Sequence, residues 1–415
     1  MKIKIFNYAI SIVLGSFTFA HINFAIASEN PIKKQDELIS ASESPLDRNL
    51  SLPNIEDLEY LQSDENLEKI VAQMFQSIVK KGQVSRPGEA RAAKRGAHAK
   101  HHGCAVGKFI IEKGLPKVFR KGVFAREIEY KAFVRFSNGT SEIKSDLIPD
   151  SHGMAIKLLG INAQLLDDYE ANGEKNTQDF IMIDTPIFFL RKAEDYISVM
   201  TASARGPDGL KEWMKSHPYE AVILTQSLKE MKISPLGSQF WSQTPYKLGA
   251  NNAMKFTAKP CAKQNFSDLP LKNAVNDNYL KEGLAQYLAK ENACYEFFVI
   301  PQRDKKNMPI EDSTIEWPTQ WNGQKNIFKL ATLLLPKGQV TNSDLSMQYC
   351  EDMSFTPWHG TEDLKPLGEV NLVRKYVYSE LSKFRLHLNN LTQLLPSEDI
   401  WQKLMGQRKN TVEKE

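Results

Sequence analysis

The sequence predicts a folded protein that combines α-helices with β-strands. Of its 415 residues, 41% are apolar and 10% are aromatic, which is enough to form the core of one large domain or of two. Short runs rich in β-branched and aromatic residues end at turn signals and indicate strands, whereas longer segments with apolar residues at three- and four-residue spacing indicate helices. These patterns establish a mixed α and β protein without separating a barrel from an open sheet.

The N-terminal residues have the composition of an export signal. Two lysines precede an apolar run over residues 5–20, and residues 25–27 offer the small side chains that a signal peptidase recognises. We therefore expect residues 1–27 to be a signal peptide that is removed, and the mature protein to be periplasmic or secreted. An uncleaved membrane anchor is the alternative, because a spanning helix needs roughly 20 apolar residues. His21 and Asn23 interrupt the stretch, which favours removal.

Residues 28–85 are expected to form an N-terminal arm and a helix. The first part, up to about residue 53, is polar and lacks apolar periodicity, as in a linker. Over residues 54–81 the apolar residues recur at helical spacing, which predicts one amphipathic helix or a broken pair. The following residues 86–100 are rich in lysine and arginine, so they form either a solvated basic loop or a set of cations that meets the carboxylates of a cofactor.

The largest domain is expected over residues 86–395, followed by a C-terminal tail over residues 396–415. Within it, residues 132–136 illustrate a strand, because Ala-Phe-Val-Arg-Phe runs up to the turn signal Ser-Asn-Gly. A long helix is expected from residue 370 onward, where apolar residues return at helical spacing. In chain order, strands are expected at 132–136, 154–159, 180–183, 295–300 and 327–335, and further helices at 193–204, 210–229 and 280–291.

The charge balance excludes a nucleic-acid partner. The 53 basic and 50 acidic residues leave a net charge of +3, without the concentrated positive field that nucleic acid requires. After the signal segment no window is long and apolar enough to span a bilayer, so no stable membrane span is expected once the signal is removed. Assembly into a homo-oligomer is left open.

Four cysteines, Cys104, Cys261, Cys294 and Cys350, lie far apart in the sequence. Their wide spacing argues against a CxxC redox or zinc motif. In an exported chain their even number allows one or two disulfides, with three connectivities if all four pair. Four reduced, buried thiols are the alternative, because a domain of this size needs no disulfide to fold.

Five short segments form an ordered pattern between about residue 90 and about residue 390. They are His98-Ala99-Lys100 with Gly103, Ala132 to Ser137, His152 to Lys157, Asp184 to Arg191, and Pro366-Leu367-Gly368 with Asn371, Arg374 and Tyr378. In order and approximate spacing they resemble the core of the catalase superfamily, in the form of its shorter bacterial members. The resemblance implies an α+β fold with a catalase-like antiparallel β-barrel core and flanking helices. It also implies a haem b cofactor with its iron, and a peroxide substrate.

Tyr378 is the iron ligand that this resemblance implies. A free phenol titrates near roughly pH 10, so a tyrosine that binds ferric iron needs neighbours that favour its anion. Arg374 lies four positions earlier, which on a helix places its guanidinium on the same face as the Tyr378 oxygen. Tyr376 is the competing ligand, but it lies on another face. Without a cofactor, the same pattern describes an amphipathic helix with a core tyrosine and a surface arginine.

His98 resembles the distal acid/base of the family. Cleaving a peroxide requires a proton to move from one oxygen to the other, and a neutral imidazole can accept and return it because its pKa lies near ambient pH. Ser137 matches the serine that hydrogen-bonds this histidine and sets its orientation. Zinc binding by His98, His101 and His102 is the alternative, although no acidic or thiol ligand accompanies them in the motif.

Other matches imply contacts with the haem itself. Arg95 and Arg135 match the arginines that bind the propionates, whose carboxylates favour guanidinium forks. Phe188 and Phe189 would wall the pocket, and Tyr196 matches the aromatic residue that stacks on the porphyrin. Each has an ordinary alternative, the arginines as surface cations and the aromatic rings as core.

One segment departs from the family in a way that bears on the reaction. Catalases place an asparagine just before Thr-Pro-Ile-Phe-Phe, where its amide donates to bound peroxide, whereas this chain has Ile183-Asp184. Asp184 is therefore a catalytic position to test, because an ionised carboxylate cannot donate and would repel developing negative charge unless it is protonated or turned away. The resemblance implies a haem-dependent catalase or peroxidase, and the N-terminal segment implies that it is exported. The alternatives are a lipid hydroperoxide dehydratase or isomerase, a non-catalytic haem-binding protein, and a binding protein without cofactor.

Overall fold

The computed structural model describes residues 52, 79–80, 83–85, 91–166, 174–228, 231–262, 264–266 and 276–406. The expected signal peptide, almost all of the expected arm and helix over 28–85, and the end of the tail at 407–415 lie outside these residues.

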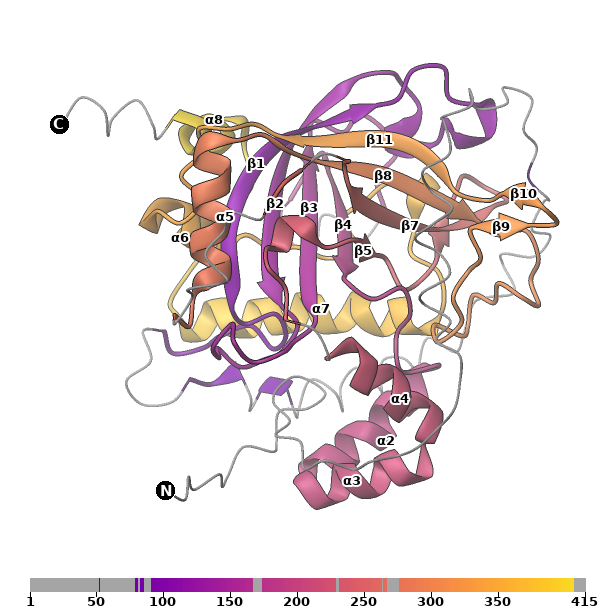
Figure 1. Ribbon diagram of the computed structural model, residues 1–415, viewed down its shortest axis with the longest axis vertical. Coiled ribbons are helices and arrows are strands. Elements are labelled where there is room, and N and C mark those ends of the chain that lie inside the picture. The colour runs from indigo at the N-terminus through magenta and orange to yellow at the C-terminus, as the bar shows by residue number, and fades with distance from the viewer. Residues whose placement is uncertain are drawn as a thin grey trace.

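An antiparallel β-barrel with flanking helices is the centre of the fold, as predicted (Figure 1). Eight of the described strands follow one another in the order β5, β4, β3, β2, β1, β11, β8 and β7, and β5 pairs with β7 to close the barrel. The strands are β1 (His101–Ile111), β2 (Glu129–Asn138), β3 (His152–Leu159), β4 (Thr177–Ile183), β5 (Phe240–Trp241), β7 (Ala253–Pro260), β8 (Ala293–Pro301) and β11 (Phe328–Leu335), with the short β6 (Tyr246–Lys247) beside β7 and a separate pair, β9 (Gln320–Trp321) and β10 (Gln324–Lys325).

The inside of the barrel is filled with side chains. Residues alternate between the two faces of a strand, so each strand sends every second side chain inward. Phe109, Phe180, Phe256 and Phe297 meet there as one buried cluster, in which the ring centroids of Phe180 and Phe297 are 4.8 Å apart. Because the interior is packed, a large cofactor has to bind outside the barrel.

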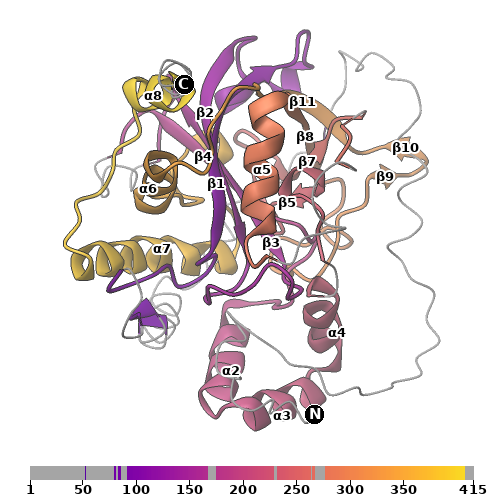
Figure 2. The same cartoon turned by 60° about the vertical axis from the view of Figure 1, so that its left-hand side comes forward.

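Helices cover the outside of the barrel and one of its ends (Figure 2). α5 and α6 pack on β1, and α8 packs on β1 and β2. α7 runs beneath the strands and contacts α2, which forms a group with α3 and α4 (Figure 1). The helices are α2 (Ala193–Ala204), α3 (Pro207–Ser216), α4 (Pro218–Ser227), α5 (Tyr279–Lys290), α6 (Asp344–Asp352), α7 (Glu369–Leu388) and α8 (Glu398–Gly406), and 3₁₀ turns span Lys117–Phe119, Gly122–Phe124, Pro235–Gly237 and Glu362–Leu364.

Two helices stand where the sequence predicted one. The expected helix over 210–229 is divided, because α3 ends at Ser216 and α4 begins at Pro218. Proline lacks a backbone N–H donor and its ring blocks the preceding turn, so it is favoured at the first position of a helix and disfavoured within one. β1 and β7 were not among the expected strands.

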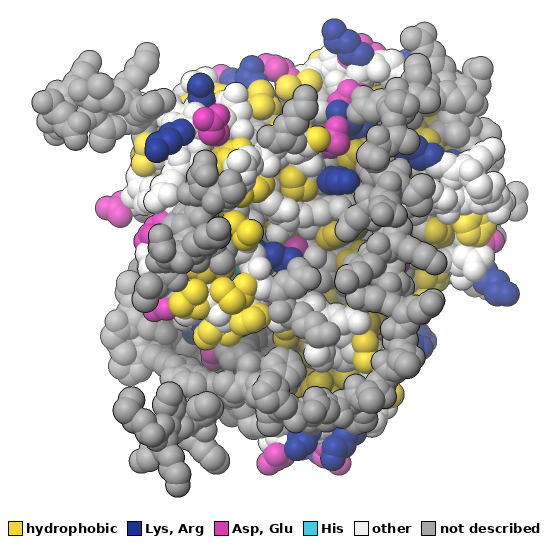
Figure 3. Space-filling model, viewed as in Figure 1, with side chains coloured by type: hydrophobic (Ala, Val, Ile, Leu, Met, Phe, Trp, Pro, Cys, Tyr) yellow, Lys and Arg dark blue, Asp and Glu magenta, His cyan; other side chains and the backbone are white. Residues whose placement is uncertain are grey.

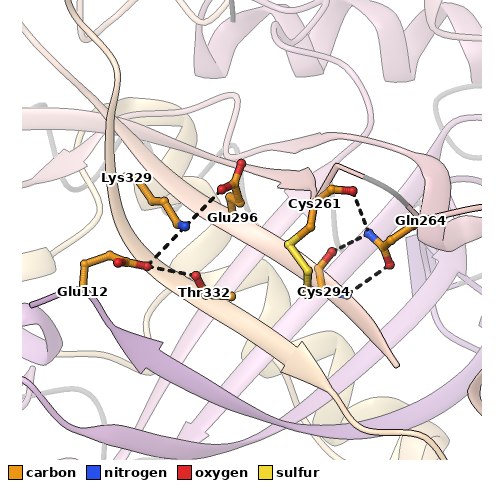
Figure 4. The surroundings of a disulfide bond; sticks show 7 residues. All are labelled: Glu112, Cys261, Gln264, Cys294, Glu296, Lys329 and Thr332. Atoms are coloured by element: carbon orange, nitrogen blue, oxygen red, sulfur yellow. Dashed lines mark hydrogen bonds and ion pairs between the residues drawn. A yellow bond between two sulfur atoms is a disulfide. The ribbon is translucent and has the colours of Figure 1, made fainter. Parts of the chain in front are cut away.

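One disulfide joins the end of β7 to β8. Cys261 and Cys294 are bonded to each other, and the Gln264 side chain donates to the Cys294 carbonyl at 2.7 Å and accepts from the Cys294 amide at 3.1 Å (Figure 4). Cys104 and Cys350 are buried free thiols. Of the alternatives for the cysteines, the structure therefore shows one disulfide and two thiols.

Basic and acidic side chains are interspersed with polar and apolar ones on the face drawn in Figure 3. This mixture agrees with the nearly balanced charge of the sequence. None of the helices in the described part of the chain combines the length and the apolar character that crossing a membrane requires.

Candidate functional site

A cavity of about 490 Å³ lies where the barrel meets α7 and the group formed by α2, α3 and α4. Of the catalytic and cofactor-binding candidates, Ser137 and Asp184 are not part of its wall, whereas the others are. Because these residues come from distant parts of the chain, the fold brings them together. They are Arg95, His98, Arg135, Phe189, Tyr196, Arg374 and Tyr378.

The His98 ring is held at the end of β2. A carbonyl can only accept, so the ring donates through Nδ1 to the Asn138 carbonyl at 2.6 Å, and the Ser137 hydroxyl lies 3.1 Å from the same nitrogen. Nε2 is therefore the acceptor of the ring. Burial, followed by the positive charge of Arg135, lowers the pKa of His98 to about 4. The imidazole is thus neutral at ordinary pH.

The His98 backbone is in the left-handed region, with φ at +55°. Such a conformation costs a non-glycine residue about 1–3 kcal/mol, and it persists where surrounding contacts hold it. The ring packs closely on Gly153 of β3, where an added Cβ atom would lie 2.6 Å from His98 Cε1. A glycine is therefore needed at this position for the ring to keep its place.

Asp184 points away from the cavity. Its carboxylate accepts from the His152 amide at 2.8 Å and lies 3.3 Å from the His152 ring, with Lys232 Nζ at 3.8 Å. The preceding residue, Ile183, lines the cavity instead, since consecutive residues of an extended chain point to opposite sides. Of the alternatives left open for Asp184, this geometry agrees with a carboxylate that is turned away from the site.

Arg374 and Tyr378 lie one turn apart on α7. Arg374 Nη2 donates to the Tyr378 hydroxyl at 3.1 Å, while Nη1 donates to Thr244 Oγ1 at 3.2 Å and to Asn371 Oδ1 at 3.0 Å. Burial opposes the charge of Arg374, but the neighbouring tyrosine oxygens together outweigh it and raise the pKa of the guanidinium. Tyr376, the competing ligand, does not line the cavity.

Guanidinium groups gather between His98 and the end of α6. Burial, followed by the charge of Arg95, lowers the pKa of Arg135 to about 10. Within the described residues this group holds four arginines and two carboxylates, so two positive charges are left without a partner of opposite sign. A ligand with two carboxylates would balance them. The group consists of Arg91, Arg95, Arg135, Arg385, Glu351 and Asp352.

Comparisons with known proteins bear on this arrangement. The family model described as Catalase matches residues 67–230. Over these residues the chain is similar to catalases. A solved structure of a fungal catalase matches with a TM-score of 0.54 and 17% sequence identity, a level that by itself shows the fold alone. The match covers 81% of this chain and 66% of the fungal one, so the chain spans just under two thirds of the fungal catalase. Among curated proteins no sequence matches.

The residues around the cavity fit haem, which members of the catalase superfamily typically bind. Two unbalanced positive charges match the two propionates of haem b, and Tyr378 offers an oxygen atom to its iron. Arg385 Nη1 is buried and makes no hydrogen bond to any described residue, although carboxylates lie 3.6 and 4.0 Å away. A buried donor of this kind needs an acceptor, which a propionate would supply.

Aromatic and aliphatic residues form an apolar part of the wall. The Phe188 ring centroid lies 4.9 Å from that of Phe189 and 5.8 Å from that of Tyr196. Val373 and Val377 of α7 belong to the same buried cluster and also line the cavity. A broad apolar wall suits the flat hydrophobic face of a porphyrin.

Two candidates of the site were missed in the sequence. Arg385 follows Tyr378 by seven residues, which is two turns along the same face of α7, so its spacing could have indicated it. Glu351 had no such signal, because its partners Arg95 and Arg385 lie far away in the chain.

The zinc alternative finds no support in the geometry. His101 and His102 do not line the cavity with His98. His101 Nε2 instead lies 3.5 Å from a carboxylate oxygen of Glu351, and His102, the second residue of β1, is completely buried.

A separate buried cluster lies outside the cavity wall. Among the described residues, Glu174, Asp179 and His359 are placed as metal ligands could be. Lys157 already ion-pairs with Glu174 and with Asp179, the latter at 2.7 Å, and His359 Nδ1 lies 3.2 Å from the other Asp179 oxygen. Because the Lys157 ammonium supplies the positive charge, His359 has a structural role here.

Proposed function

We propose that this protein is a member of the catalase superfamily and a haem-dependent enzyme that consumes peroxides. Family and fold support a peroxide-metabolising haem enzyme in general. The proposal is carried by one observation: His98 and the Arg374–Tyr378 pair, from opposite ends of the domain, line the same cavity. When bound, haem would supply the iron that activates the peroxide O–O bond.

Tyr378 would hold the iron, with the Arg374 guanidinium at hydrogen-bond distance from its oxygen. A positive charge at hydrogen-bond distance stabilises a phenolate relative to a phenol. The bonds from Arg374 Nη1 to Thr244 and Asn371 keep the guanidinium in this position. The proximal ligand is therefore oriented before the cofactor arrives.

His98 would move the proton during peroxide cleavage. Since Nδ1 donates to the Asn138 carbonyl, the lone pair of Nε2 can accept a proton from one peroxide oxygen and return it to the departing one. With a pKa of about 4, the imidazole is neutral when peroxide arrives, and its protonated form readily gives the proton back.

Ile183 favours a peroxidase over an efficient hydrogen peroxide dismutase. Catalases use an asparagine amide in this segment to donate to bound peroxide, whereas the wall of this cavity offers an aliphatic side chain. Loss of the donor weakens the orientation of a second hydrogen peroxide, while an organic reductant does not depend on it. We therefore infer a peroxidase with an organic reductant. A lipid hydroperoxide dehydratase or isomerase and a non-catalytic haem-binding protein would use the same cofactor residues and differ in their products.

We also propose that the protein is exported. The signal-like character of residues 1–27 favours this location. The Cys261–Cys294 disulfide supports it, because disulfides form and persist mainly in oxidising compartments.

The test of the proposed function uses the holoprotein, purified after expression with ample haem. Its visible spectrum is recorded, and oxygen release from hydrogen peroxide is compared with oxidation of a phenolic reductant. A Soret band together with faster reductant oxidation supports a peroxidase, whereas dominant oxygen release would make the protein a catalase. Absence of any Soret band would overturn the proposal.

A further inference from the structure

Glu351, near the end of α6, contacts two arginines and one histidine beside the cavity. Its Oε2 atom ion-pairs with Arg95 Nη1 and lies 3.5 Å from His101 Nε2, while Oε1 lies 3.6 Å from Arg385 Nη1. The Glu351 side chain is only 12% exposed, so water and salt screen these interactions little.

Arg95 connects Glu351 to the backbone of His98. While Nη1 pairs with Glu351, Nε and Nη2 donate to the His98 carbonyl at 3.0 and 2.7 Å, and Nη2 also donates to the Ala99 carbonyl at 3.1 Å. One planar guanidinium thus bridges a carboxylate and two consecutive backbone carbonyls. A lysine could not replace it, because its ammonium is a single point of charge without the fork geometry.

The backbone that Arg95 holds is the left-handed one at His98. The His98 amide donates to the Gly139 carbonyl at 3.1 Å, and the Ala99 amide donates to the Thr140 carbonyl at 3.0 Å. The loop after β2 therefore holds the amides, and Arg95 holds the carbonyls. The unusual conformation is kept by contacts on both sides.

We propose that Glu351 is a positioning residue for His98 and that it acts through Arg95. By fixing the guanidinium, Glu351 holds the His98 carbonyl, and with it the left-handed backbone that sets the direction of the imidazole. The inference rests on the proposed acid/base role of His98. Arg95 would then have two roles: it holds the His98 and Ala99 carbonyls, and it contacts a propionate as expected from the sequence.

Two neighbouring carboxylates on α6 allow a matched comparison. Asp352 follows Glu351 and ion-pairs with Arg91 instead of Arg95. Glu351→Gln and Asp352→Asn each remove one negative charge from the same helix end and hardly change the shape of the side chain. Only Glu351→Gln weakens the contact with Arg95.

Hydrogen exchange of the full-length protein tests, independently of activity, whether Glu351 stabilises the backbone at His98 and Ala99. Glu351→Gln should speed exchange at the His98 and Ala99 amides by roughly tenfold, because a weaker neutral hydrogen bond replaces a charge-assisted one. Asp352→Asn should leave their exchange nearly unchanged. Parent-like exchange in Glu351→Gln, or equal acceleration by both variants, would overturn the proposal.

A double-mutant cycle on the holoprotein tests whether Glu351 acts through Arg95. Glu351→Gln should preserve the Soret band and slow peroxide consumption, whereas adding it to Arg95→Ala should cause no further loss. If the losses of rate in the two single variants added up fully in the double variant, Glu351 would not act through Arg95. If the parent holoprotein consumed no peroxide, the proposed function would fail. The exchange measurement alone would then show whether Glu351 holds the His98 backbone.

Discussion

Arg374 donates to the Tyr378 hydroxyl at 3.1 Å, and its guanidinium carbon lies 5.2 Å from the centre of the Tyr378 ring. Of the two tyrosines on α7, only Tyr378 lines the cavity. The cation that stabilises a phenolate therefore stands beside the one α7 tyrosine that a bound cofactor could reach.

Tyr378→Phe should abolish or alter the ferric haem spectrum, because the ring loses the oxygen that would bind iron. Tyr376→Phe makes the same chemical change two residues earlier, on a side chain outside the cavity wall, and should leave the spectrum as it is. Visible spectra of both variants at equal protein concentration check this. A parent-like spectrum in Tyr378→Phe would remove the ligand assignment.

His98→Gln should retain haem and slow peroxide consumption by about 10²–10⁴-fold, the usual effect of losing a general acid/base. The Soret band and the rate are measured on the same preparation. Undiminished turnover would assign the proton transfer to another group.

Stability should also depend on pH through His98. Its pKa is 6.5 in the unfolded reference and about 4 in the folded protein, so between these values the unfolded chain binds more protons. Above pH 6.5 the imidazole is neutral in both the folded and the unfolded protein, so no folding free energy is lost to its protonation. As the pH falls to about 4, about 3 kcal/mol of stability is lost. Urea unfolding of parent and His98→Gln across this range should show a flatter curve for the variant; parallel curves would contradict the shift.

Gly153→Ala should displace the His98 ring, since the new Cβ atom would lie 2.6 Å from Cε1. A misplacement of about 1 Å can slow a reaction by roughly 10²-fold, while the proximal residues that would hold haem are untouched. Gly406→Ala is the control, because an added Cβ there has open space around it. Peroxide consumption at equal haem content is the measurement, and equal rates in both variants would refute the close contact.

Ile183→Asn should raise oxygen release relative to reductant oxidation, because it brings an amide donor to the cavity wall. Asp184→Asn should not, since that side chain faces His152. An oxygen electrode and a phenolic reductant assay on each variant give the ratio. The opposite ranking of the two variants would show that residue 184 reaches the substrate.

Local pattern accounts for much of the fold. The strand signal at residues 132–136 lies within β2, and the helical spacing from residue 370 corresponds to α7. Periodicity of this kind belongs to the element itself, so it can be recognised without the rest of the chain. The two residues of β5 carry no such signal, yet their pairing with β7 closes the barrel.

For the site, the sequence by itself determined that Arg374 and Tyr378 share a helix face, because a spacing of four residues is local geometry. Its motifs also indicated His98 as the distal residue. Only the tertiary structure decided that Ile183, and not Asp184, reaches the cavity, and that Glu351 is joined through Arg95 to the His98 backbone. Both depend on where β4 and α6 lie relative to distant segments, and that placement comes from the closed barrel and the packing of α6 on β1.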